Sequence, residues 1–177
     1  MNLKPNVSRK KHNLLKNLRQ NFFMCSENNR HKNGTEWRNF YGRFKGKSLS
    51  ATQTKALLTE FEKYSLQNIS WEENPLRKQI KLSEIFDKKH IWLEIGFGGG
   101  EHLIHQARLN PDIGFIGCEP YQNGVAKLMG KLNANPCQNI KLYDGDVRNI
   151  FDVLAKNSIS KVFLLYPDPW PKKRHHR

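Results

Sequence analysis

Four short apolar runs, separated by segments with helical periodicity, constrain the fold of this chain more than any other feature. The runs span residues 91–95, 113–118, 140–143 and 161–166, and the intervening segments span residues 101–109, 121–132 and 147–156. Strands that alternate with helices of this length predict a parallel sheet with right-handed crossovers. Because the runs are mainly apolar, both faces of the sheet are expected to be covered.

The part of the chain before these runs divides into two further regions. Residues 1–47 are rich in Asn, Lys and Arg with interleaved aromatic side chains, and we expect a basic N-terminal arm that is partly disordered. Residues 48–90 are expected to form a helical connector, with one short helix over residues 50–66. Residues 91–177 then form the α/β domain.

The charge of the chain is strongly positive and unevenly distributed. The formal net charge is +14, and residues 1–47 hold 12 basic and 2 acidic side chains. The last six residues, Lys172, Lys173, Arg174, His175, His176 and Arg177, form a second basic cluster. Two separate blocks of cations favour nucleic acid as a partner.

Export from the cell and insertion into a membrane are not expected. No apolar stretch approaches the length of a membrane span, and the N-terminus lacks the apolar run of a secretory signal. The three cysteines, Cys25, Cys118 and Cys137, are odd in number and scattered, which excludes a disulfide framework. These features predict a cytoplasmic protein.

A glycine-rich turn follows the first apolar run and precedes a helix. Gly96, Gly98 and Gly100 form a G-x-G-x-G pattern, and Glu101 stands where a dinucleotide-binding turn has its third glycine. A carboxylate at that helix N-terminus would repel a pyrophosphate. It would accept S-adenosylmethionine, which has no phosphate and carries a sulfonium and an ammonium. Glu94, two residues before the turn, adds a second negative charge.

Acidic residues also follow the second and third apolar runs. Glu119 is placed to accept hydrogen bonds from ribose hydroxyls. Asp144 and Asp146 are placed to reach an adenine amino group. Because the carboxyl ends of parallel strands meet at one edge of a sheet, these acids are expected to surround a single cofactor crevice.

A proline-rich segment, YPDPWP, follows the fourth apolar run at residues 166–171. Its prolines predict a rigid, extended loop that presents Asp168 and Trp170 at the rim of the crevice. A carboxylate, an indole and a following basic cluster suit a flipped base, a stacking surface and phosphates.

Three of these stretches together resemble the bacterial tRNA (guanine-N7)-methyltransferases. They are LEIGFGGGEHL at residues 93–103, GCE at residues 117–119 and PDPWPKKRHH at residues 167–176, and residues 41–49 are also similar to the N-terminal arm of that family. The resemblance implies a Rossmann-like class I S-adenosylmethionine-dependent methyltransferase with a mostly parallel sheet. It further implies methylation of N7 of guanine 46 in the variable loop of tRNA.

The resemblance also implies roles for individual residues. Cofactor binding falls on Glu94, Gly96, Gly98, Gly100, Glu119, Asp146 and Asp168. The catalytic acid falls on Asp168 as well. RNA binding falls on Trp170, Lys172, Lys173, Arg174, His175, His176 and Arg177. Methyltransferases of this fold have seven strands and only the first four are found here, so we expect the chain to be the N-terminal part of a longer protein.

Three other functions are compatible with parts of the sequence. A non-catalytic RNA-binding protein, or an inactive fragment of a methyltransferase, would use the same basic blocks. A nucleotide-dependent oxidoreductase is disfavoured by Glu101. His102 and His105 lie three residues apart on a predicted helix, but no further ligand completes a recognisable metal site, and no metal is expected.

Overall fold

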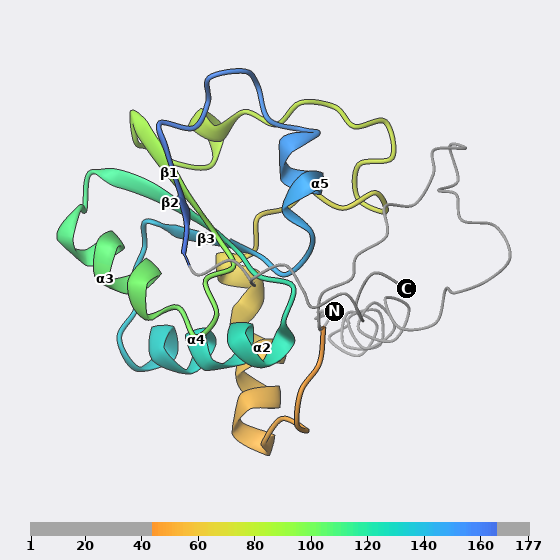
Figure 1. The fold of residues 1–177 in the computed structure, drawn as a ribbon, viewed down its shortest axis with the longest axis vertical. Helices are drawn as coiled ribbons and strands as arrows, with labels where there is room; N and C mark the ends of the chain where they lie inside the picture. Colours follow the sequence, from red (N-terminus) through yellow and green to blue (C-terminus); the bar gives the residue numbers. More distant parts are fainter. Residues whose placement is uncertain (1–43, 166–177) are drawn as a thin grey trace, which may run out of the picture. The chain divides into compact units, whose positions relative to one another are not determined.

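The computed structural model describes residues 44–165, and their centre is a parallel four-stranded sheet (Figure 1). The strands are β1 (His90–Ile95), β2 (Ile113–Cys118), β3 (Ile140–Tyr143) and β4 (Lys161–Leu164). Their order in the sheet is β3-β2-β1-β4, and every neighbouring pair is parallel. The predicted parallel α/β architecture, Rossmann-like in its strand order, is therefore confirmed.

The helices of the described part lie close to their predicted positions, with one exception. They are α2 (Ala51–Tyr64), α3 (Glu101–Leu109), α4 (Gln122–Ala134) and α5 (Val147–Phe151), together with the 3-10 turn η1 (Leu82–Glu84). Helix α2 begins with a capping box, in which Ser50 and Gln53 each accept a hydrogen bond from the backbone N–H of the other.

Helix α5 is shorter than the predicted 147–156 segment and ends at Phe151. The residues that follow pair with an earlier segment of the chain. The backbone N–H of Ile80 donates to the carbonyl of Val153 at 2.9 Å, and Ile80 forms an isolated parallel bridge with Leu154. Val153 is fully buried. Pairing with a segment more than 70 positions earlier therefore replaces the helix there.

Both faces of the sheet are covered, as the apolar strands predicted. On one face, α2, α3 and α4 pack over the sheet around buried side chains that include Leu103, Phe115 and Leu128. On the other face, residues 66–86 and α5 cover a second buried cluster that includes Ile69, Leu93, Ile116 and Ile150. Figure 1 shows α3 and α4 together on one side of the sheet and α5 on the other.

Strand β4 lies at the edge of the sheet in the described part of the chain. Its apolar side chains Val162 and Leu164 are 49% and 58% exposed. Trp92 of β1 and Phe163 stack edge to face at 5.6 Å, and the ammonium of Lys161 lies over both rings. A cation and aromatic rings thus cover part of this edge.

The order of the strands fixes where a ligand can bind. Moving along the chain, the sheet grows from β1 outward through β2 to β3, and then returns to place β4 on the other side of β1. In open parallel sheets, ligands bind beyond the carboxyl ends of the strands at this reversal. The Gly96–Gly100 turn follows β1 directly, so it lies at this position.

Candidate functional site

The glycine turn has a backbone conformation that other residues rarely adopt. Gly96, Gly98 and Gly100 have φ values of 72°, 55° and 75°, in the left-handed region. The buried ring of Phe97 anchors the turn in the core, and Gly100 serves as the N-cap of α3. The turn therefore presents backbone rather than side chains at the carboxyl edge of the sheet, and the backbone N–H groups at the start of α3 lie beside it.

One face of α4 supports this turn. A Cβ atom on Gly124 would overlap the backbone carbonyl oxygen of Gly98, and the side chain of Leu128 packs on Gly100. One turn further along, the Lys131 ammonium donates to the carbonyl of Gly99 at 2.7 Å. Positions 124, 128 and 131 have the spacing of one helix face. The spacing is visible in the sequence, but nothing in the sequence indicates that this face meets the turn.

Glu119 ties the turn to the start of α4. One carboxylate oxygen accepts a hydrogen bond from the Gly98 N–H at 2.7 Å, and the other accepts from the Tyr121 N–H at 2.8 Å. The residue is only 7% exposed. Sequence reasoning placed Glu119 toward a ribose. The structure shows that its carboxylate also holds the glycine turn, and each oxygen keeps a second lone pair for a further donor.

Glu94 lies on β1 and is buried beneath the turn rather than open beside it. Its side chain is 3% exposed, and its Oε2 lies 2.7 Å from Nδ1 of His102 on α3. Burial raises the pKa of the Glu94 carboxyl, and the His102 hydrogen bond opposes that rise. The His102 ring also contacts Phe163 of β4 edge to face at 4.9 Å. His102, considered in the sequence as a metal ligand, is here the partner of a carboxylate.

This burial gives a prediction about stability and pH. Below the ordinary Glu pKa of 4.5, the Glu94 carboxyl is neutral in both the folded and the unfolded state. As pH rises through its raised pKa, the folded state must hold a buried anion, and stability is lost. Glu94→Gln is therefore expected to gain stability relative to the wild type as pH rises from about 4 to 8.

Chemical denaturation of both proteins at several pH values measures this difference. If the stability of the wild type instead rose relative to that of Glu94→Gln with increasing pH, the contact with His102 would outweigh the cost of burying the carboxylate. A His102→Asn variant tests that contact separately, because it leaves Glu94 buried without an imidazole.

Of the two acidic residues after β3, Asp146 has a local partner. Asp146 is the N-cap of α5: its Oδ1 accepts from the Arg148 N–H at 2.9 Å. Its carboxylate also forms an ion pair with the Arg148 guanidinium, with Nε at 2.8 Å from Oδ2. Asp144 is exposed. A contact from Asp146 to an adenine amino group would thus use a carboxylate that already caps a helix.

Glu101 differs from the sequence interpretation. Its side chain is 74% exposed and forms an ion pair with Lys131 of α4. The hydrogen bond from Lys131 lowers the pKa of the Glu101 carboxyl. The charge at this helix N-terminus is therefore partly balanced, so the repulsion of a pyrophosphate is weaker than the sequence alone suggested.

The sheet places the predicted acidic residues on three adjacent strands. Glu94 lies near the end of β1, Glu119 follows β2, and Asp146 follows β3, and these strands are neighbours with their carboxyl ends at one edge. The remaining predicted site residues lie outside the described residues: Asp168, Trp170, Lys172, Lys173, Arg174, His175, His176 and Arg177.

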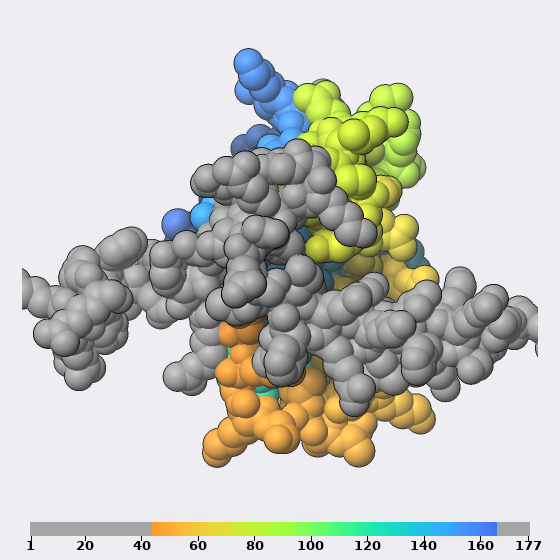
Figure 2. All heavy atoms as spheres, turned by 90° about the vertical axis from the view of Figure 1, so that its right-hand side faces the viewer, coloured from red at the N-terminus to blue at the C-terminus, as the bar shows by residue number. Residues whose placement is uncertain are grey.

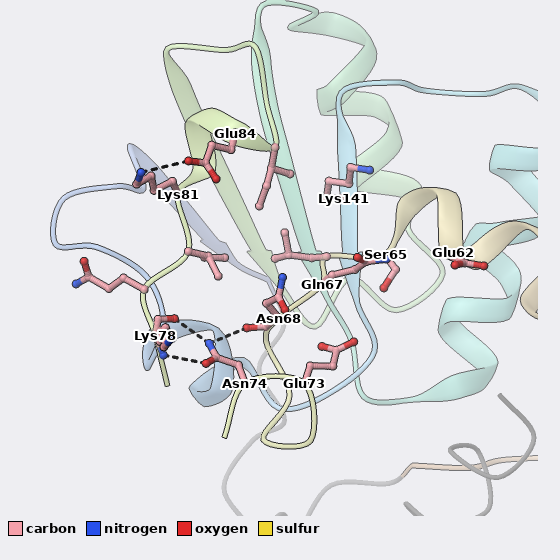
Figure 3. Close-up of a pocket in the computed structure, with 14 residues that line it drawn as sticks. Glu62, Ser65, Gln67, Asn68, Glu73, Asn74, Lys78, Lys81, Glu84 and Lys141 are labelled. Carbon is pink, nitrogen blue, oxygen red and sulfur yellow. Dashed lines mark hydrogen bonds and ion pairs between the residues drawn. The ribbon is translucent and has the colours of Figure 1, made fainter. Parts of the chain in front are cut away.

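A separate polar pocket lies elsewhere, between residues 65–85 and β3 (Figure 3). It has a volume of about 700 Å³, and its lining includes none of the predicted site residues. Two of its charged side chains, Lys81 and Glu84, form an ion pair at 3.2 Å. Asn74 holds the adjoining loop through its hydrogen bonds with the backbone of Asn68 and Lys78. This pocket therefore has no connection to the predicted chemistry.

Residues 44–165 contain neither a metal-binding cluster nor a membrane-spanning helix. No group of three or more His, Cys, Asp or Glu side chains is arranged to hold a metal ion there. Over the same residues, no helix has both the length and the apolar character needed to cross a membrane.

Comparison with known proteins places the chain among methyltransferases. Curated relatives named tRNA (guanine-N(7)-)-methyltransferase include one from Ruegeria sp., 53% identical over 148 residues, which are 84% of this chain and 58% of the relative. Another, from Jannaschia sp., is 56% identical over 140 residues, 79% of this chain and 59% of the relative. The matched part thus spans about three fifths of the length of these relatives.

The family described as "Putative methyltransferase" matches residues 88–177. This match covers β1, the glycine turn, Glu119 and every strand of the sheet. It extends over half of the chain and includes the carboxyl edge at which the predicted acidic residues gather. The chain therefore belongs to this methyltransferase family.

Proposed function

We propose that this chain binds S-adenosylmethionine at the glycine turn and takes part in methylating N7 of guanine 46 in tRNA. The observation that carries the proposal is the Glu119 carboxylate, which follows β2 and holds the glycine turn through the Gly98 N–H. The names of relatives that are 53–56% identical support the same reaction and the same substrate. A cytoplasmic location and tRNA as the partner are parts of this proposal.

The described residues fit the chemistry of this cofactor. S-adenosylmethionine carries a sulfonium and an ammonium, and the turn lies beside the carboxylates of Glu94 and Glu119. Glu119 retains acceptor capacity for ribose hydroxyls, Glu94 lies on β1 beneath the turn, and Asp146 follows the end of β3. When bound, the cofactor supplies the methyl group.

Guanine N7 needs little chemical activation. It has an in-plane lone pair and already acts as a hydrogen-bond acceptor, so no general base is required to make it a nucleophile. The protein's contribution is then to position N7 in line with the methyl group and to stabilise the positive charge that develops on the ring. A carboxylate suits the second task, and the resemblance assigns it to Asp168.

Mass spectrometry of tRNA nucleosides after incubation with the full chain and S-adenosylmethionine tests the reaction. The expected product is 7-methylguanosine. A non-catalytic RNA-binding protein would bind tRNA and leave it unmodified. Binding of radiolabelled S-adenosylmethionine, with NAD as the competitor, distinguishes a methyltransferase from an RNA-binding protein and from an oxidoreductase.

The role proposed for Asp168 gives a specific prediction. Asp168→Ala is expected to lower the rate of methyl transfer by about 100-fold or more, because a carboxylate that stabilises developing charge is lost. The dissociation constant for tRNA should change little. Methyl transfer at the wild-type rate would show that Asp168 has no catalytic role.

A further inference from the structure

The last residues of the basic arm dock on the start of α4. The backbone N–H of Gln122 donates to the carbonyl of Phe44 at 3.0 Å. The Asn123 side chain makes two more bonds: its Oδ1 accepts from the Gly46 N–H at 2.8 Å, and its amide nitrogen donates to the Lys47 carbonyl at 2.7 Å. One side-chain amide thus satisfies a donor and an acceptor of a segment 77 positions away.

A second, independent contact specifies the same docking. A Cβ atom at Gly46 would overlap the hydroxyl of Tyr121, so the segment approaches α4 closely because it has glycine at that position. Figure 2 shows the chain from residue 44 into α2 (orange) at the surface of the molecule. Residues 44–47 are therefore held against α4 while their side chains remain exposed.

The docking position adjoins the glycine turn. Tyr121, whose N–H binds Glu119, immediately precedes the two residues that hold the segment. Gly124, which contacts Gly98, immediately follows them. The start of α4 thus contacts the cofactor turn through one set of atoms and the arm through another.

The two stretches that meet at the docked segment are rich in lysine. Residues 44–59 contain three lysines and no Asp or Glu, and residues 121–143 also contain three lysines and no Asp or Glu. Helices α2 and α4, which belong to these two stretches, pack together around Ala56, Val125 and Met129. The exposed Lys45, Lys47 and Lys127 form what we call the lysine surface. Exposed lysines on two segments that contact each other suit a polyanion.

We propose that Asn123 docks residues 44–47 so that the lysine surface binds the phosphate backbone of RNA beside the cofactor turn. This inference rests on the proposed function in one respect, which is that the substrate is an RNA. Asn123 is a positioning residue, because its side chain holds the backbone of Gly46 and Lys47. Phosphate contacts of this kind set the position of an RNA without reading its sequence.

Binding of the full chain to tRNA, measured by fluorescence anisotropy over a series of salt concentrations, tests the proposal. Asn123→Ala removes both side-chain bonds and is expected to raise the dissociation constant about five- to tenfold. It should also reduce the salt dependence, as about two phosphate contacts are lost. Asn133→Ala is the matched control, since Asn133 is exposed at the other end of the same helix.

Further variants separate docking from a general effect on folding. Gly46→Val should weaken tRNA binding by a similar factor, because a side chain at position 46 would overlap the hydroxyl of Tyr121. Lys45→Ala with Lys47→Ala should weaken binding by a similar factor, and adding Asn123→Ala should cause little further loss, because all three changes remove the same contacts. An unfolding temperature close to that of the wild type will show that a variant is folded.

The outcomes distinguish this inference from the proposed function. If Asn123→Ala binds tRNA as Asn133→Ala does, or if its loss adds fully to that of the lysine variants, the inference is wrong even where 7-methylguanosine is formed. A wild-type chain that binds no tRNA also overturns it. If the wild type binds no S-adenosylmethionine, and Asn123→Ala binds tRNA more weakly than the wild type, the proposed function fails and the docking inference stands.

Discussion

Glu119→Ala is expected to raise the dissociation constant for S-adenosylmethionine by about 100-fold and to destabilise the fold by about 2 kcal/mol or more. The carboxylate holds the N–H groups of Gly98 and Tyr121, and each such charge-assisted bond contributes on the order of 1.5–3 kcal/mol. Without it, the turn and the start of α4 lose their common anchor. Isothermal calorimetry and thermal unfolding measure the two effects.

Glu119→Gln separates charge from shape. The glutamine has the same length and keeps one oxygen for an N–H donor, but it replaces the other oxygen with a donor that would face the second N–H. An intermediate loss of affinity is therefore expected. Glu62→Gln is the control for removing one negative charge, because Glu62 is exposed on α2. Cofactor affinity within twofold of the wild type in Glu119→Ala would contradict this account of the site.

Gly124→Ala is expected to destabilise the protein although alanine favours helices. A helical Gly→Ala change normally contributes about 0.5–1 kcal/mol of stability. At position 124, however, the new Cβ would overlap the backbone carbonyl oxygen of Gly98, which cannot rotate away as a side chain can. Moving α4 or the turn is expected to cost about 1–3 kcal/mol and to weaken cofactor binding together with stability.

The same helix provides the matched control for this prediction. Gly130 also lies within α4, is exposed, and has no atom within 4 Å of a Cβ built on it. Gly130→Ala should therefore raise the unfolding temperature and leave cofactor binding unchanged. We therefore expect Gly124→Ala to lower stability and Gly130→Ala to raise it, although both are the same change in the same helix. Thermal unfolding measures stability, and calorimetry measures cofactor binding. An increase in stability for both would show that the α4 contact does not constrain the turn.

The regular elements were largely predictable because their signals are local. Strands β2 and β3 and helix α3 have the bounds read from the sequence, since apolar runs and helical spacing report burial and periodicity directly. The end of α5 was not predictable in this way. Its last turns are lost because Val153 and Leu154 pair with Ile80, and no property of residues 147–156 indicates that partner.

The candidate site shows the same division. The positions of the glycine turn and Glu119 followed from their places after apolar runs, and that of Glu94 from its place near the end of the first run. The partners of these residues did not. His102 faces Glu94, Lys131 meets both Gly99 and Glu101, and Asn123 holds an arm segment that lies 77 positions earlier. In each case the contact depends on which face of a helix meets the turn.

By itself, the sequence determined the parallel α/β architecture, the edge at which a ligand binds, and the gathering of carboxylates at that edge. These depend on apolar burial, on left-handed glycines and on strand direction, which act over a few neighbouring residues. Only the tertiary structure showed that α4 contacts the glycine turn and holds residues 44–47 of the arm. Contacts between residues far apart in the chain depend on how helices pack across the sheet, and short-range patterns do not contain that information.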